Sequence, residues 1–93
     1  MILSFRDKRT ELIFSGRCPK GFPPDVFPAA RRKLEAINAA HVLADLQSPP
    51  GNRLHALSRD RAGQHAIRIN DQFRICFRWT DAGPADVEIV DYH

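Results

Sequence analysis

The first half of the chain carries apolar residues at the spacing of an amphipathic helix. Between residues 26 and 40, four apolar side chains recur every three or four positions: Phe27, Ala30, Leu34 and Ile37. This period places them on one face of a helix, and the charged residues between them fall largely on the other face. Asp25 precedes the segment as a candidate N-cap, and Pro28 falls in the first turn, where a missing N–H costs little. We expect a helix over residues 26–40 that buries its apolar stripe.

Shorter elements are expected on either side of this helix. Asp7 is a candidate N-cap for a helix over residues 8–15, and Gly16 stands just past its end. Residues 1–5 are expected to form a short strand. Residues 42–47 are expected to add one helical turn before a pair of prolines stops it.

The second half of the chain changes to the two-residue period of β-strands. Three segments alternate apolar and polar side chains: residues 65–69, 73–79 and 86–91. Residues 53–58 are expected to add a further strand. Asn70 and Asp71 tolerate the positive φ of a two-residue turn, so we expect a hairpin between the first two alternating segments.

The alternation sorts the strand residues onto two faces of a sheet. One face is apolar and is expected to pack on the helices: Ile67, Ile69, Phe73, Ile75, Phe77, Trp79, Val87 and Ile89. The other face is mixed: Ala66, Arg68, Arg74, Cys76, Arg78, Glu88, Val90 and Tyr92. We therefore expect a single α+β domain over residues 1–93, with a small antiparallel sheet and two main helices packed on one face. The uncovered, arginine-rich face is where chemistry is expected.

Length and composition limit what this chain can be. Its 93 residues support one modest core and exclude an enzyme with separate cofactor and substrate domains. Hydrophobic residues make up 43% and charged residues 27%, which is typical of a soluble globular domain. No apolar run approaches the roughly 20 residues that span a bilayer, and no signal-peptide pattern opens the chain, so we expect a cytoplasmic protein without membrane contact. Cys18 and Cys76 are too few for a disulfide framework and are expected to be buried or neutral thiols.

Positive charge is concentrated in two regions. Residues 1–40 hold eight Lys or Arg against four Asp or Glu, and residues 53–78 hold six Arg against two acids, so each region carries a net charge of +4. Residues 79–93 hold four acids and neither Lys nor Arg. Two basic regions on so small a protein favour a polyanion as partner, although a merely solvated basic surface has the same composition.

No familiar catalytic motif is present. Phosphate-binding, dinucleotide-binding, zinc-protease and nucleophile-elbow patterns are missing, as is any Cys-x-x-Cys pair. A metal site would have to use His55, His65, His93 and Asp91, which form no close ligand pair in the sequence. A thiol enzyme would depend on Cys76, whose pKa the neighbouring arginines are expected to lower. Neither interpretation has a supporting motif.

Cleavage of RNA needs no metal and no cofactor, because the 2′-hydroxyl beside each phosphate is a built-in nucleophile. The reaction needs a base, an acid for the leaving 5′-oxygen, and cations for the additional charge on phosphorus. The candidates for proton transfer are His55, Asp91, Tyr92 and His93. The candidates for charge stabilisation are Arg68, Arg74 and Arg78. The alternative is an ordinary strand histidine, arginines in surface ion pairs, and a frayed C-terminus.

Four segments of the second half carry a family resemblance: residues 53–57 (RLHAL), 60–64 (DRAGQ), 67–79 (IRINDQFRICFRW) and 90–93 (VDYH). In this order they closely resemble the HigB toxins, which belong to the RelE-like superfamily of bacterial type II toxin–antitoxin systems. The resemblance implies a compact α+β toxin that cleaves messenger RNA in the decoding site of translating ribosomes, without a cofactor. It also implies a helix-turn-helix (HigA-like) antitoxin as partner, with operator DNA bound only through that antitoxin.

The resemblance also assigns roles by position. It implies five catalytic residues: His55, Arg74, Asp91, Tyr92 and His93. The two histidines are the expected proton-transfer groups, Asp91 orients a histidine or shares the base role, and Tyr92 stacks on a base or donates its hydroxyl. Arg74 faces the scissile phosphate. Further RNA contacts are expected from Arg59, Arg61, Arg68 and Arg78. Which group is acid and which is base stays open, as does codon preference.

The chain departs from the family pattern shortly after His55. Many relatives read Leu-Lys-Gly-Asp-Arg where residues 57–61 read LSRDR, so Ser58 replaces a lysine and Arg59 a glycine. If that lysine binds phosphate, Arg59 or Arg61 must take over its role. The alternative function is therefore a catalytically weakened toxin that still binds its antitoxin or RNA as a co-repressor module. A ribosome-independent ribonuclease is a further alternative.

Overall fold

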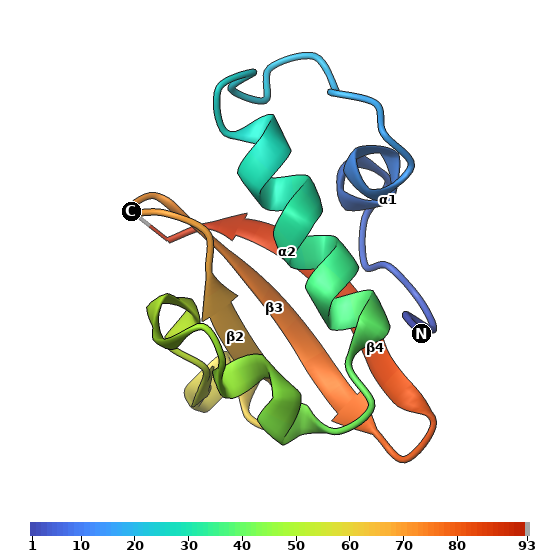
Figure 1. Cartoon of the computed structure of the whole chain (residues 1–93), viewed down its shortest axis with the longest axis vertical. Coiled ribbons are helices and arrows are strands. Elements are labelled where there is room, and N and C mark those ends of the chain that lie inside the picture. The colour runs from blue at the N-terminus through green and yellow to red at the C-terminus, as the bar shows by residue number, and fades with distance from the viewer. Residues whose placement is uncertain (93) are drawn as a thin grey trace.

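Two helices cover one face of a four-stranded antiparallel sheet in the computed structural model of the chain, which describes residues 1–92 (Figure 1). The α-helices are α1 (Lys8–Phe14) and α2 (Phe27–Ala39). The strands are β1 (His55–Ala56), β2 (His65–Arg68), β3 (Phe73–Thr80) and β4 (Gly83–Asp91), arranged in the order β1-β2-β3-β4. Three short 3₁₀ helices are η1 (Leu43–Gln47), η2 (Pro50–Asn52) and η3 (Arg59–Arg61). The predicted α+β fold is confirmed.

The core lies between α2 and the apolar face of the sheet. Ala30, Leu34 and Ile37 of α2 are fully buried, as their helical spacing predicts. The buried sheet residues that pack with them are Ile67, Ile69, Phe73, Ile75, Phe77, Val87 and Ile89. Each fully buried Leu or Ile stabilises the fold by about 1.5–3 kcal/mol. Along residues 1–92, no helix has the length and apolar character needed to cross a membrane.

The two helices begin in different ways. The carboxylate of Asp7 accepts a hydrogen bond from the Thr10 N–H at 2.9 Å, so the predicted cap of α1 is confirmed. The predicted cap at Asp25 is wrong. Val26 occupies the N-cap position of α2 and makes no side-chain cap bond. Val26 packs in the core, and its N–H donates to the carbonyl of Pro23. Because the buried Val26 takes the N-cap position, Asp25 lies one residue before the cap.

The N-terminal segment runs along β4 but makes only an isolated bridge, in place of the predicted strand. Phe5 pairs in parallel with Val87, and neighbouring backbone bonds join Ser4 and Arg6 to the same residue. The register between β3 and β4 shifts between Cys76 and Arg78, and Asp86 has a left-handed φ of 54°. This bulge turns the Asp86 N–H onto the Ser4 hydroxyl, so a regular ladder cannot continue.

Two further predictions need correction. The strand expected over residues 53–58 is limited to His55–Ala56, and the left-handed φ of 49° at Arg53 breaks the extended conformation before it. The hairpin between β2 and β3 is not a two-residue turn. The carbonyl of Phe73 accepts from the N–H groups of both Ile69 and Asn70, while the Asn70 side chain accepts from the Phe73 N–H. Asn70 therefore closes the turn through its side chain, without positive φ.

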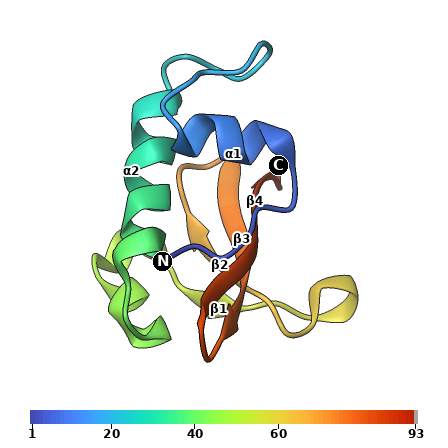
Figure 2. The same cartoon turned by 90° about the vertical axis from the view of Figure 1, so that its right-hand side faces the viewer.

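The sheet face opposite the helices is not uncovered as expected. The loop over residues 57–64, which contains η3, lies on that side of the sheet (Figure 2). Ala66 and Cys76, which pair with each other across β2 and β3, are fully buried on this face. Burial raises the pKa of the Cys76 thiol, and this effect outweighs the opposite influence of nearby arginines. The other cysteine, Cys18, is exposed and forms no disulfide.

Candidate active site

His55 begins the edge strand β1, and Arg53 and Leu54 separate it from the 3₁₀ turn η2. Asn52 holds that turn, because its buried amide donates to the carbonyls of Leu46 and Ser48 at 3.2 Å and its oxygen accepts from the Lys33 ammonium. The exposed His55 ring places Nδ1 2.7 Å from the Arg53 carbonyl oxygen. Since a carbonyl only accepts, Nδ1 carries the hydrogen, and a neutral ring then presents the lone pair of Nε2.

Arg74 is the second residue of β3 and is half-buried. Its guanidinium carbon is 5.2 Å from the centre of the Tyr92 ring, close enough for a cation–π contact. Its Nε is buried and has no hydrogen-bond partner in the part of the chain that the structure describes. Arg74 also lies opposite Arg68 in the strand register, so two cations are adjacent. Such a pair of like charges favours an anion between or above them.

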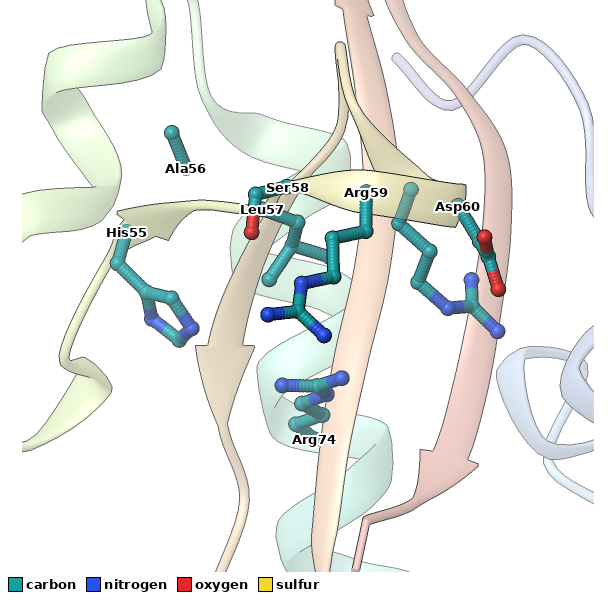
Figure 3. A pocket seen from close by; sticks show the side chains of 8 residues that line it. His55, Ala56, Leu57, Ser58, Arg59, Asp60 and Arg74 are labelled. Atoms are coloured by element: carbon teal, nitrogen blue, oxygen red, sulfur yellow. The ribbon is translucent and has the colours of Figure 1, made fainter.

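Two adjoining hollows meet at His55 and Arg74. The larger is about 390 Å³ and is formed by β1, the following loop and β3. The smaller, about 220 Å³, is lined by Arg53, His55, Arg68, Arg74 and Tyr92. In the larger hollow, the guanidinium groups of Arg59 and Arg74 point toward one another, and the His55 ring lies to one side (Figure 3). We call the two hollows together the cationic cleft. They are of a size suited to a nucleotide phosphate and its sugar.

The hairpin between β2 and β3 holds the end of β4 against the cleft. The Tyr92 hydroxyl donates to the Asn70 carbonyl at 2.8 Å, and the Tyr92 N–H donates to the Gln72 carbonyl at 3.0 Å. The Gln72 amide in turn donates to Asp91 at 2.9 Å. Tyr92 therefore lines the cleft, while the exposed Asp91 lies next to it and lines neither hollow. His93 lies outside the described residues.

The four arginines expected to contact RNA differ in their surroundings. Arg59 lines the larger hollow with a left-handed φ of 57°, and the structure gives it no ion pair within residues 1–92. Arg61 lines the same hollow but pairs with Glu88. Arg68 lines the smaller hollow, and its hydrogen bond to Asp71 raises its pKa. Arg78 lines neither hollow. It lies farther along β3 and pairs with Asp86 at 3.2 Å.

Sequence reasoning missed several residues of this site. Arg53 lines the smaller hollow, and its place in the loop before His55 was the available signal. The support given by Asn70, Gln72 and Glu88 depends on contacts across strands, which residue spacing does not reveal. Within residues 1–92, no group of three or more His, Cys, Asp or Glu side chains is placed to hold a metal ion. The cleft thus combines an imidazole with several guanidinium groups, the chemistry of an anion site that can also transfer a proton.

Fold and cleft together define a small α+β protein with a cationic cleft on one side of its sheet. Comparison with known proteins shows which family the chain belongs to. Residues 3–93 match the family model described as the RelE-like toxin of type II toxin–antitoxin system HigB. The chain is 38% identical over 82 residues to Toxin HigB-1 of Vibrio cholerae, covering 87% of this chain and 86% of that protein. It is 29% identical to Endoribonuclease HigB of Proteus vulgaris over the full length of both chains.

The chain therefore belongs to the HigB family of RelE-like toxins of type II toxin–antitoxin systems. Membership in such a two-component system means that an antitoxin is its partner. The match covers both the helices and the cationic cleft, so the family resemblance, which extends over essentially the whole chain, is confirmed.

Proposed function

We propose that this chain is an endoribonuclease that cleaves messenger RNA on translating ribosomes by attack of the RNA's own 2′-hydroxyl on the adjacent phosphate. The observation that carries the proposal is the convergence of His55, Arg74 and Tyr92, with Arg59 and Arg68, on one cleft. The Proteus vulgaris relative, which matches over its whole length, is named an endoribonuclease. The family resemblance supports the proposed ribosome dependence. The proposed site of action is the cytoplasm, because the proposed substrate is messenger RNA on ribosomes.

The cleft supplies the groups that this reaction needs. Nε2 of His55 takes the proton of the 2′-hydroxyl, since hydrogen bonding at Nδ1 leaves Nε2 as the free basic nitrogen. The 2′-oxygen bonds to phosphorus, and Arg74 and Arg59 balance the charge that develops on the phosphoryl oxygens. The bond from phosphorus to the 5′-oxygen then breaks. The products are a 2′,3′-cyclic phosphate and a 5′-hydroxyl.

The leaving 5′-oxygen takes its proton from the C-terminal segment of the chain. Tyr92 lines the smaller hollow, and Asp91 precedes it at the end of β4. We assign the acid to this segment, with His93 as the candidate donor and Asp91 as the group that orients it. Tyr92 provides an aromatic face for an adjacent base, and its partly exposed ring leaves that face accessible.

The departure at Ser58 favours a second candidate function, a weakened toxin that acts with its antitoxin as a co-repressor. Ser58 lines the larger hollow at the position where many relatives carry a lysine. Arg59 lines the same hollow and has its guanidinium directed at Arg74 (Figure 3). A cation is therefore retained beside the proposed phosphate position, which supports the active enzyme over the weakened one.

The partner that neutralises the toxin is proposed to be a helix-turn-helix antitoxin. In that arrangement the antitoxin binds operator DNA, and the toxin reaches the DNA only through it. A basic surface attracts polyanions generally, DNA included. Specific binding of operator DNA by the toxin alone would therefore argue against this division of roles.

Induced expression, alone or with the neighbouring antitoxin gene, tests the function. We expect growth arrest that the antitoxin relieves, together with new message ends in cells. Purified protein should cut message bound to ribosomes and leave the same naked RNA intact. Normal translation at high toxin levels would favour the co-repressor. Cleavage of naked RNA at an equal rate would show a ribosome-independent ribonuclease.

A further inference from the structure

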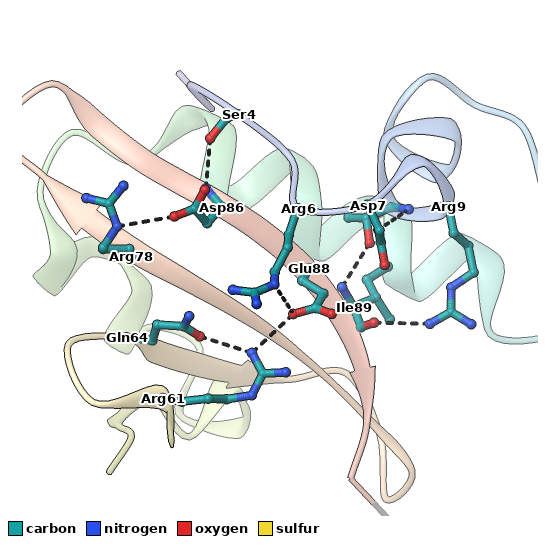
Figure 4. A network of polar contacts seen from close by, with 11 residues as sticks. Ser4, Arg6, Asp7, Arg9, Arg61, Gln64, Arg78, Asp86, Glu88 and Ile89 are labelled. Atoms are coloured by element: carbon teal, nitrogen blue, oxygen red, sulfur yellow. Dashed lines mark hydrogen bonds and ion pairs between the residues drawn. The ribbon is translucent and has the colours of Figure 1, made fainter. Parts of the chain in front are cut away.

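Glu88 lies on the sheet face opposite the helices, at the centre of a polar network. Its Oε1 is 3.1 Å from Nη1 of Arg61 and 3.8 Å from Nε of Arg6 (Figure 4). Its side chain is only 20% exposed, and its two ion-pair partners come from the N-terminal segment and from the loop over residues 57–64. A carboxylate this sheltered is retained where it is hydrogen-bonded and its charge is balanced. Arg61 supplies the hydrogen bond, and Arg6, at 3.8 Å, supplies a second positive charge.

The Arg61 contact joins the loop over residues 57–64 to β4. The loop is closed at its base by the Leu57 N–H, which donates to the Gln64 carbonyl at 2.9 Å. Nη1 of Arg61 is shared between Glu88 and the side-chain oxygen of Gln64, each at 3.1 Å. One guanidinium group therefore fixes both the loop's own closure and its position over the sheet.

The same loop forms one wall of the cationic cleft and carries Arg59. Arg59 adopts a left-handed φ of 57°, a conformation that a residue with a side chain holds only when its surroundings enforce it. Its side chain is directed at Arg74, a second cation (Figure 3). Like charges repel, so holding Arg59 at this place requires an anchor elsewhere in the loop.

We propose that Glu88 is a positioning residue, and that Arg61 is its anchor partner and not a contact to the RNA phosphate. Glu88 acts through Arg61 to hold the loop so that Arg59 faces the substrate phosphate. This inference rests on the proposed ribonuclease function for its catalytic consequence. The anchoring itself can be measured without any activity.

The competing explanation is electrostatic. Glu88 is a negative charge close to a cleft that binds a polyanion, so its removal alone would strengthen RNA binding and free Arg61 for the phosphate. Two neutral variants separate the explanations. Glu88→Gln keeps an oxygen that accepts from Arg61, whereas Glu88→Leu has similar size and no acceptor. Both remove the charge, so a purely electrostatic role predicts the same result for both.

The first measurement is amide hydrogen exchange of residues 57–64 in the purified chain. We expect exchange in this loop to rise about tenfold in Glu88→Leu and in Arg61→Ala, and about threefold or less in Glu88→Gln. The double variant Arg61→Ala/Glu88→Leu should exchange no faster than either single variant, because both remove one interaction. Glu35→Leu makes the same substitution in a more exposed ion pair, with Arg31 on α2, and is the control that should leave the loop unchanged.

The second measurement is single-turnover cleavage of ribosome-bound message, at varied protein and salt concentrations. We expect Glu88→Leu and Arg61→Ala to lower the maximal rate about tenfold, with half-saturation and its salt dependence nearly unchanged. A phosphate-contacting Arg61 would instead raise half-saturation and reduce the salt slope by about one unit. If the loop loosens but the wild-type chain cuts no message, the proposed function fails and the anchor stands. Unchanged loop exchange in Glu88→Leu, or faster cleavage in both neutral variants, overturns the positioning role.

Discussion

Arg74 is the side chain whose loss should separate activity from stability most clearly. Its guanidinium is shared by both hollows of the cleft, and the structure gives it no ion pair within residues 1–92. Arg74→Ala removes the donors proposed to face the phosphoryl oxygens. Losing one preorganised donor to a developing oxyanion costs about 2.7–4 kcal/mol, or roughly 100- to 1,000-fold in rate. Arg74→Lys keeps the charge without the planar fork, and we expect a loss of about tenfold.

The effect on folding should be much smaller. Arg74 contributes a cation–π contact with Tyr92, worth about 0.5–1 kcal/mol at a partly exposed site. Its removal also relieves the repulsion from Arg68, its neighbour across the strands. These effects oppose each other, so the free energy of unfolding should change by less than about 1 kcal/mol.

Single-turnover cleavage of ribosome-bound message, paired with urea unfolding of the same preparations, measures both quantities. Arg31→Ala on α2 serves as a control for the loss of one positive charge, because Arg31 lies outside the cleft. If Arg74→Ala cleaves within about threefold of the wild-type rate while Arg31→Ala does the same, the phosphate role of Arg74 is refuted.

Three other changes have defined outcomes. Thr10→Val removes the hydroxyl that accepts from the buried Ile89 N–H at 2.9 Å, so urea unfolding should show a loss of about 1–3 kcal/mol. Cys18 should react with a thiol reagent near pH 8 in the native protein, whereas Cys76 should react only after unfolding, because burial raises its pKa and keeps it a neutral thiol. Ser58→Lys adds a cation to the larger hollow and should tighten binding to ribosome-bound message by about threefold to tenfold.

Each of these has a contrary result. A Thr10→Val variant as stable as the wild type would show that the Ile89 N–H finds another acceptor. Equal reaction of both thiols in the native protein would contradict the covered sheet face. Unchanged binding by Ser58→Lys would show that Arg59 already supplies the positive charge that binding needs in the larger hollow.

Periodicity predicted the parts of this fold that burial decides. Leu34 and Ile37 recur at helical spacing because α2 buries one apolar face. The residues of β3 alternate because that strand buries the sheet face that packs against it. The ends of helices and strands that depend on backbone conformation were harder to predict from the sequence. The left-handed φ of Arg53 shortens β1, and an arginine side chain does not favour that conformation, so the sequence could not predict it. Asp25 has the chemistry of a cap, but burial of the next residue moved the helix start away from it.

The site was predicted in its residue types more than in its arrangement. His55, Arg74 and Tyr92 do meet at one cleft, because alternation places them on the same side of the sheet. The partners that hold them were not foreseen. Glu88 meets Arg61 across 27 residues of sequence, and such a contact depends on the register between β3 and β4 and on the path of the loop.

The chemical form of the fragment ends tests the central claim most directly. Message should be cut on ribosomes by the purified toxin, and the new ends identified by their reaction with kinase, phosphatase and ligase. Attack by the 2′-hydroxyl within the cationic cleft predicts a 2′,3′-cyclic phosphate or its hydrolysis product on one fragment and a 5′-hydroxyl on the other. A 3′-hydroxyl with a 5′-phosphate would mean that water is the nucleophile, and would contradict the roles given to His55 and Arg74.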